Sequence, residues 1–285
     1  MVFDRLTDVY DATGVAFFQP VARRLLGLAS PVRGERALDI GCGRGAVLFP
    51  LAEAVGAAGS AVGVDIAPAM VAATAAEARD RGLTNVEVLE MDGTRPSFGD
   101  RRFDLITSSM SAALFPDVAQ VVRTYQRLLR PGGRLALTGP VPPSSMRSWA
   151  WGPLPIGRIT DAIDPAALAA AHPRVAALLD DHPFGEPGDI VAALRDAGFT
   201  AVSEIQEDVP LEAPSPQALI DWTWSNGMRV LWELVAPENR RAVSEDLMRE
   251  VAGDHPDGPC TATYPVSYCL GRLPESDGSE SEGTV

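Results

Sequence analysis

The chain contains no lysine, because all 24 of its basic residues are arginine. Without lysine a protein cannot form a Schiff base, anchor pyridoxal phosphate or carry the phosphate-binding lysine of a Walker motif. The absence therefore excludes these classes of enzyme. Arginine in place of lysine, together with abundant alanine, is also typical of a GC-rich genome.

Positive charge of any kind is scarce. The 24 arginines are outnumbered by 38 acidic residues, which gives a formal net charge of −14. Nucleic acids and anionic membrane surfaces are bound through clustered cations, so this balance argues against both as partners. We expect a neutral or cationic small ligand instead.

Cysteines and long apolar segments are also scarce. Cys42, Cys260 and Cys269 are too few and too scattered for a disulfide framework or a zinc site, so we expect free thiols and no metal centre. The weakly polar stretch 46–76 is broken by acidic residues and glycines, which predicts no membrane span. The N-terminal residues are acidic where a secretory signal is basic. We therefore expect a cytoplasmic protein.

As far as Gly139, short Val/Ile/Leu-rich runs alternate with segments of helical spacing. This alternation predicts an α/β fold, in which a parallel sheet has helices on both faces. The expected strands are residues 36–40, 60–66, 85–92, 102–109 and 133–139.

After Gly139 the alternation stops. Residues 140–160 are rich in proline and tryptophan and predict a long irregular connection, which is typical of a lid. Asp164 and Pro165 then predict the start of a helix. Beyond them we expect helices within 188–199 and 214–252, a strand over 200–209 and a last strand near 263–272. A disordered acidic tail is expected over 274–285, so that one domain spans residues 1–273.

The segment ALDIGCGRGAVLFPLAE, residues 37–53, runs from an apolar strand through three glycines into a helix. Such a turn places backbone N–H groups at the carboxyl edge of a parallel sheet, where open α/β folds bind ligands. The spacing of Gly41, Gly43 and Gly45 differs from the G-x-G-x-x-G of nicotinamide and flavin folds. Asp39 would repel a pyrophosphate and suits a cationic ligand. A tight turn without a ligand is the alternative.

Several segments, in this order, resemble those of the class I S-adenosylmethionine-dependent methyltransferases, in particular the enzymes that act on small molecules. LDIGCGRG is similar to their first motif, VGVDIAPAMV to the segment with the ribose-binding acid, and VEVLEMDG to the adenine-binding segment. RFDLITSSMSAALFPD and LLRPGGRLALTG are similar to the fourth strand and to the turn before the fifth. The resemblance covers roughly residues 35–140.

The resemblance implies a Rossmann-like, seven-stranded, mostly parallel sheet with helical insertions, and S-adenosylmethionine as the cofactor. Residues 35–140 would bind the cofactor, and the insertions 141–187 and 209–260 would form a lid and a cap over the acceptor. Asp65 would hold the ribose hydroxyls and Asp92 the adenine amino group, although each aspartate also suits a plain turn. The implied cofactor-binding residues are Asp39, Gly41, Cys42, Gly43, Gly45, Asp65, Ile66, Met70, Met91, Asp92, Gly93 and Ser108.

The residue that would accept a proton from the methyl acceptor is harder to identify. Many relatives carry a His-His pair after the fourth strand, but Ala113 and Leu114 stand at those positions here. His182, next to two aspartates, is the first candidate for a general base, His172 is the second, and Tyr10 is an alternative. No base is needed if the acceptor is an amine, a carboxylate or an electron-rich carbon.

Methyl transfer needs alignment of the reactants and exclusion of water, so the acceptor site is expected over the strand ends, beneath segments outside the sheet. Aromatic residues in these segments favour a bulky, partly apolar small molecule, such as a bacterial secondary metabolite. Packing within the cap is the alternative role for the tryptophans. The aromatic residues are Tyr10 and Phe17 near the N-terminus, Trp149 and Trp151 in the insertion, and Trp222, Trp224 and Trp232 in the cap.

Other functions stay open at this point. A cyclase on the same fold would use the cofactor pocket without methylation, and its product would have the mass of its substrate. A nicotinamide-dependent oxidoreductase conflicts with the glycine spacing. A protein acceptor is a further alternative, and the oligomeric state is open, a homodimer included.

Overall fold

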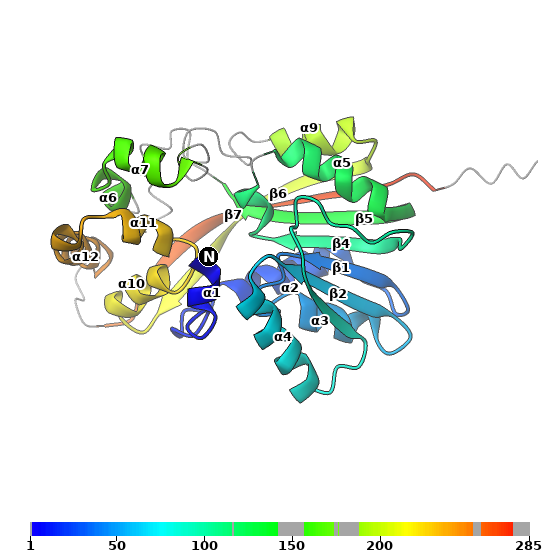
Figure 1. The fold of residues 1–285 in the computed structure, drawn as a ribbon, viewed down its shortest axis with the longest axis horizontal. Helices are drawn as coiled ribbons and strands as arrows, with labels where there is room; N and C mark the ends of the chain where they lie inside the picture. Colours follow the sequence, from blue (N-terminus) through cyan, green and yellow to red (C-terminus); the bar gives the residue numbers. More distant parts are fainter. Residues whose placement is uncertain are drawn as a thin grey trace, which may run out of the picture.

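The structure is a computed structural model that describes residues 2–115, 117–141, 157–173, 176, 188–252 and 258–275. Within these residues seven strands form one sheet in the order β3-β2-β1-β4-β5-β7-β6 (Figure 1). The strand pairs β3–β2, β2–β1, β1–β4 and β4–β5 are parallel, whereas β7 is antiparallel to both β5 and β6. The predicted mostly parallel sheet is therefore confirmed. The strands are β1 (Arg36–Ile40), β2 (Ser60–Asp65), β3 (Val86–Glu90), β4 (Phe103–Ser109), β5 (Leu129–Pro140), β6 (Thr200–Ala213) and β7 (Cys260–Arg272).

Both faces of the sheet are buried beneath helices. Successive strand residues contact different hydrophobic clusters, with Ala37 and Leu105 in one cluster and Leu38 and Ile106 in the other. This burial on both faces is why the strands read as continuous apolar runs. The first face is covered by α2 (Phe18–Ala29) and α3 (Leu48–Val55), the second by α5 (Val118–Leu128) and α9 (Asp189–Asp196), and α4 (Pro68–Asp80) contacts β2 and β3.

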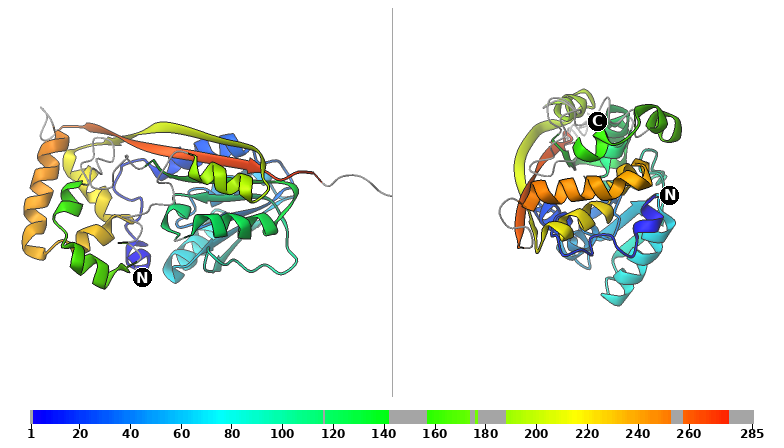
Figure 2. Two further views of the ribbon diagram at one scale, coloured as in Figure 1. Left: turned by 90° about the horizontal axis from the view of Figure 1, so that it is seen from above. Right: turned by 90° about the vertical axis from the view of Figure 1, so that its left-hand side faces the viewer.

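The strands β6 and β7 continue beyond the rest of the sheet. β5 pairs with β7 up to Pro140 and Val266, whereas β6 and β7 pair with each other as far as Ala213 and Cys260. Figures 1 and 2 show this two-stranded ribbon running out of the sheet into a second group of helices, which we call the cap. The cap helices are α6 (Gly157–Asp161), α7 (Pro165–Ala171), α10 (Pro216–Trp224), α11 (Arg229–Leu234) and α12 (Pro237–Ala252).

Side-chain caps fix where two of the cap helices begin. The Asp164 carboxylate accepts a hydrogen bond from the Ala166 amide at 2.8 Å, and Pro165 occupies the first turn, which confirms the predicted start of α7. The Ser215 hydroxyl accepts from the Ala218 amide at the start of α10, at 3.2 Å.

A short N-terminal helix, α1 (Val2–Leu6), lies between the sheet and the cap (Figure 1). On the sheet side, the Ala69 amide at the start of α4 donates to the Asp4 carboxylate at 3.2 Å. On the cap side, Arg5 forms an ion pair with Glu233 of α11. The helix therefore bridges the two parts of the molecule.

Several strand boundaries differ from the sequence-based expectation, and those of β5 and β6 differ most. β5 begins at Leu129 rather than at residue 133, because Leu129 pairs with Phe103. The register shifts between this pair and the pair Leu105–Arg134, and the extra residues lie in β5. β6 extends to Ala213 rather than to residue 209, because β7 supplies a pairing partner along its whole length.

Other expectations fall on residues outside the described ranges. Most of the proline-rich connection lies there, with Trp149 and Trp151, as do His182 and residues 276–285 of the acidic tail. In the part of the chain that the structure describes, no helix has both the length and the apolar character needed to cross a bilayer.

Candidate functional site

The glycine turn between β1 and α3 has a backbone that only glycine adopts easily. Gly41, Gly43 and Gly45 have φ values of +70°, +47° and +83°. A Cβ on Gly41 would lie 2.4 Å from the Ser111 Cβ, and one on Gly45 would lie 2.4 Å from the Phe49 ring. No heavy atom lies within 4 Å of a Cβ built on Gly43, so the turn has open space at its middle glycine.

Asp39 is a buried carboxyl group beneath this turn, on β1. Its exposed fraction is 2%, and it accepts a hydrogen bond from the Thr107 hydroxyl of β4 at 2.8 Å. Burial, with a smaller contribution from the nearby charge of Asp65, raises its pKa to about 7 against the lowering effect of the Thr107 hydrogen bond. A cation placed over the turn would favour the ionised form of Asp39.

Asp65 ends β2 and is tied to the turn. Its Oδ2 accepts the Gly43 N–H at 2.9 Å, and its Oδ1 accepts the Ala67 N–H at 2.9 Å. Burial raises its pKa, while these amide donors lower it. A carboxylate has about four acceptor positions, so Asp65 retains capacity for two further donors.

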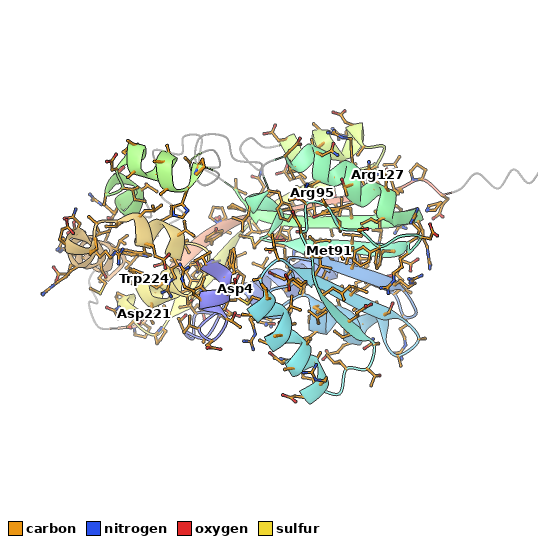
Figure 3. The ribbon with its side chains drawn as sticks, viewed as in Figure 1. Asp4, Met91, Arg95, Arg127, Asp221 and Trp224 are labelled. Atoms are coloured by element: carbon orange, nitrogen blue, oxygen red, sulfur yellow. The ribbon has the colours of Figure 1, made fainter. Side chains whose placement is uncertain are left out.

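The segment after β3 lies along the same edge of the sheet, where Figure 3 labels Met91. The Met91 amide donates to the Asp65 carbonyl at 2.9 Å, and its sulfur accepts the Ser97 amide at 3.4 Å. One oxygen of Asp92 accepts both the amide and the hydroxyl of Thr94, and the Thr94 hydroxyl is the main reason why the pKa of Asp92 is lowered. A Cβ on Gly93 would lie 2.7 Å from Ile40, which explains the glycine there.

The remaining residues expected to contact a cofactor differ in exposure. Ile66 is 44% exposed beside Asp65, whereas Met70 is 1% exposed and packs with Leu6 beneath α1. Cys42 is buried in the turn, and burial raises the pKa of its thiol, which disfavours the thiolate.

Ser108 is fully buried at the end of β4. Its hydroxyl lies 2.6 Å from that of Ser111, which in turn donates to the Ile40 carbonyl at 2.7 Å. Ser111 therefore joins the end of β1 to β4, a role that the sequence did not single out.

Of the two candidate bases that the structure describes, one lies in the cap and the other near the turn. His172 follows α7 and is exposed in the cap, and His182 lies outside the described residues. The Tyr10 ring is half-buried, and burial, with the charges of Asp11 and Asp65, raises the pKa of its hydroxyl far above the usual range. Tyr10 therefore keeps its proton at neutral pH and is suited to donate a hydrogen bond rather than to accept a proton.

Arg44, which sequence reasoning missed, fastens the N-terminal segment to the turn. Its guanidinium donates to the Thr7 carbonyl at 2.9 Å and to the Glu77 carboxylate of α4 at 3.0 Å. An arginine inside a glycine turn carries no sequence signal for such a long-range contact. The bond places residues 2–10 close to the turn.

Five rings, two of them on the consecutive residues Phe17 and Phe18, form what we call the aromatic cluster. The Trp222 ring lies 5.4 Å from that of Phe17 and 6.5 Å from those of Phe18 and Tyr264. Tyr10 completes the cluster by stacking on Phe18 at 5.0 Å. The structure thus brings together Tyr10, Phe17 and Trp222, which the sequence had proposed separately.

Trp224 and Trp232 form a second aromatic pair, apart from the aromatic cluster. They stack on each other at 5.0 Å within the cap. Within the described ranges, no three His, Cys, Asp or Glu side chains gather in a way that could hold a metal ion.

Comparisons with known proteins agree with this geometry. A family model described as a methyltransferase domain matches residues 37–133, the stretch from β1 to the start of β5. Nocamycin O-methyltransferase of Saccharothrix syringae is 60% identical over 279 residues, which cover 98% of this chain and 100% of that protein.

Two further matches have lower sequence identity. Aklanonic acid methyltransferase of Streptomyces sp. (strain C5) is 48% identical over 139 residues, 49% of this chain and 63% of that protein. The crystal structure of the Bacillus subtilis protein YcgJ shares the fold with a TM-score of 0.59 at 18% identity, covering 90% of this chain and 99% of that one. Because the first relative matches over almost the whole of both chains, the chain belongs to the class I S-adenosylmethionine-dependent methyltransferases.

Proposed function

We propose that the protein transfers a methyl group from S-adenosylmethionine to an ionised oxygen of a small carboxylic acid, forming a methyl ester. The observation that carries the proposal is where the described candidate bases lie. His172 is exposed in the cap, whereas Tyr10 packs against the cluster of Leu6, Ala67 and Met70 beside Asp65. Burial raises the pKa of the Tyr10 hydroxyl, which therefore keeps its proton and is a poor proton acceptor. A carboxylic acid with a pKa of about 4 is already ionised at pH 7, so its oxygen attacks without a base.

The relatives' names support an oxygen acceptor and an acid. One is named an O-methyltransferase and the other is named for an acid, and the first matches nearly the whole chain. Since the first relative is a methyltransferase, methylation is favoured over the cyclase alternative. We place this reaction in the cytoplasm, with a small molecule rather than a nucleic acid as the acceptor.

The residues at the turn fit the cofactor. When bound, S-adenosylmethionine supplies an activated methyl group on a positively charged sulfur. Asp65 has acceptor capacity for two ribose hydroxyls, and exposed Ile66 beside it offers an apolar surface for the adenine ring. Asp92 would accept the adenine amino group on its second oxygen, and Asp39 supplies negative charge beneath the turn.

Other predicted residues would support cofactor binding indirectly, through the shape of the turn. Ser108, Cys42 and Met70 are buried, so we propose that they shape the turn and the start of α4 rather than contact the cofactor. Gly43 leaves the open space that a ligand atom needs. Residues 35–140 would thus bind the cofactor, and the cap would bind the acceptor.

The test is product mass with a panel of acids. The purified protein is incubated with S-adenosylmethionine and 2-naphthoic acid, with aklanonic acid, and with the matching primary amides. The proposal predicts that the acids gain one CH₂ unit, that mild alkali removes it, and that the amides do not react. Methylation of the amides but not of the acids would overturn the acid assignment, and products of unchanged mass would favour a cyclase.

A further inference from the structure

Two buried tryptophans of the cap differ in how their indole N–H groups are satisfied. Trp232 is fully buried, and its Nε1 donates to the Thr223 hydroxyl at 2.8 Å. Trp222 is 1% exposed, and its Nε1 has no hydrogen-bond partner among the described residues. An indole N–H can only donate, and a buried donor without an acceptor costs about 1–3 kcal/mol. Such a group calls for an explanation.

The rings that surround Trp222 explain why the protein supplies no acceptor. Phe17 meets it edge to face at 5.4 Å, and Phe18 lies at 6.5 Å. Tyr264 stands at a steep angle to it at 6.5 Å. Three aromatic neighbours surround the indole with ring faces and edges and offer its N–H no hydrogen-bond acceptor.

The aromatic cluster also reaches the edge of the sheet where the cofactor would bind. Phe18 carries the stacked Tyr10 ring at 5.0 Å, and both rings are only half-buried. Tyr10 packs against the cluster of Leu6, Ala67 and Met70, and the Ala67 amide donates to Asp65, so this end of the cluster lies close to the proposed ribose site. The cluster therefore runs from the proposed cofactor site to α10 of the cap.

We propose that the Trp222 indole N–H donates a hydrogen bond to an oxygen of the methyl acceptor, and that the aromatic cluster selects a planar, conjugated acid. This inference rests on the function proposed above. A flat acid would place its ring system against the half-buried Tyr10 and Phe18, with an oxygen toward the indole. Hydrogen bonds from neutral donors to charged oxygens are stronger than those to neutral ones, which favours an ionised acceptor.

The test measures acceptor binding apart from turnover. The affinity of 2-naphthoate is determined by titration calorimetry in the presence of S-adenosylhomocysteine, for the wild-type protein and for Trp222→Phe. Trp232→Phe is the matched control, because it removes an indole N–H that already has its partner. A further variant carries benzothienylalanine at position 222, which keeps the shape of the ring and lacks the N–H.

The inference predicts that both changes at Trp222 weaken 2-naphthoate binding by about tenfold, the effect of one hydrogen bond to a charged group. Affinity for S-adenosylhomocysteine stays at the wild-type value in both variants. The melting temperature stays at the wild-type value in the benzothienylalanine variant, whereas the smaller ring of Trp222→Phe lowers it by leaving a cavity. Trp232→Phe lowers the melting temperature and leaves 2-naphthoate affinity unchanged.

Three outcomes overturn the inference. Unchanged 2-naphthoate affinity in the Trp222 variants would show that the N–H does not contact the acceptor. A lower melting temperature without that loss would assign the N–H to packing, and a wild-type protein that binds S-adenosylhomocysteine but not 2-naphthoate would exclude the planar acid. If the wild-type protein did not bind S-adenosylhomocysteine, the proposed function itself would be overturned.

Discussion

Gly41, Gly43 and Gly45 share a left-handed backbone conformation, but their surroundings differ. The first and third are enclosed by Ser111 and Phe49, whereas the middle one faces open space. Two of the glycines therefore allow the turn to fold, and the third leaves room for a ligand. This separation of roles makes the turn open to a direct test by alanine substitution.

We expect Gly43→Ala to fold and to lose cofactor affinity. The new methyl group meets no protein atom and costs about 1–2 kcal/mol of backbone strain, but it occupies space beside the proposed cofactor site. Calorimetric titration should show at least about a tenfold loss of S-adenosylhomocysteine affinity. Gly34→Ala is the matched control, because Gly34 has φ +88° and equally open surroundings in the connection before β1. Wild-type affinity in Gly43→Ala would contradict this account of the turn.

The raised pKa of Asp39 predicts how the ligand-free protein responds to pH. Its pKa is 3.8 in an unfolded chain and about 7 in the fold, so the folded state holds the proton more tightly. The stabilising contribution of this proton is complete below pH 3.8 and is lost as the pH rises towards 7. The free energy of unfolding from urea titrations should thus fall less steeply over this range in Asp39→Asn than in the wild type. If the free energy of unfolding changed equally with pH in the two proteins, the raised pKa of Asp39 would be excluded.

Cofactor binding should also release a proton from Asp39. Near pH 7 the carboxyl group is about half protonated, and a positively charged ligand above it favours ionisation. Titration of S-adenosylmethionine in buffers of different ionisation enthalpy should therefore show release of about half a proton. Asp39→Asn should show none of this release, and an equal release in both proteins would assign it to another group.

The short helix α1 is held in place by contacts that local sequence signals do not predict. Its contacts come from Asp4 with the start of α4, from Arg5 with α11, and from Arg44 with the Thr7 carbonyl. None of these contacts follows from local propensity, because each joins residues far apart in the chain. The helix is short, so its stability depends on these tertiary contacts.

We expect Arg44→Ala to release α1 while the sheet stays folded. Hydrogen exchange of residues 2–10 should become faster, whereas residues of β1 and β4 keep their protection. Arg81→Ala is the control, because Arg81 pairs with the same Glu77 from the surface and does not contact the N-terminal segment. Unchanged exchange in Arg44→Ala would show that other contacts hold α1.

The sequence predicted those elements whose signals are local. Strands β1 to β4 followed from apolar runs, and Asp164 with Pro165 predicted the start of α7. The early start of β5 and the long β6–β7 ribbon were missed, because strand pairing between distant segments decides their ends. The same holds for the contact of Trp222 with Phe17, which only the assembled fold creates.

At the scale of the whole molecule, the net charge of −14 acts on both proposed ligands in opposite senses. It attracts a cationic cofactor and repels an anionic acceptor, and dissolved salt weakens both effects. The expected cationic ligand is accounted for by the cofactor, whereas an acid must be held by local contacts such as the aromatic cluster.

Salt should therefore shift the two affinities in opposite directions. On going from about 20 to about 200 mM sodium chloride, S-adenosylmethionine should bind more weakly and 2-naphthoate more tightly. S-adenosylhomocysteine, which carries no net charge, is the control and should change little. Equal salt dependence of all three ligands would contradict the proposed role of the net charge.

The central claim is that Asp65 and the glycine turn bind the cofactor. The most direct measurement is titration calorimetry of S-adenosylmethionine and S-adenosylhomocysteine with the wild type, Asp65→Asn and Glu90→Gln, since Glu90 is the register partner of Asp65 on β3. The account predicts micromolar binding to the wild type, a loss of at least about tenfold in Asp65→Asn, and no change in Glu90→Gln. Absence of binding to the wild type, or equal binding in Asp65→Asn, would show that the turn and its carboxylate serve the fold alone.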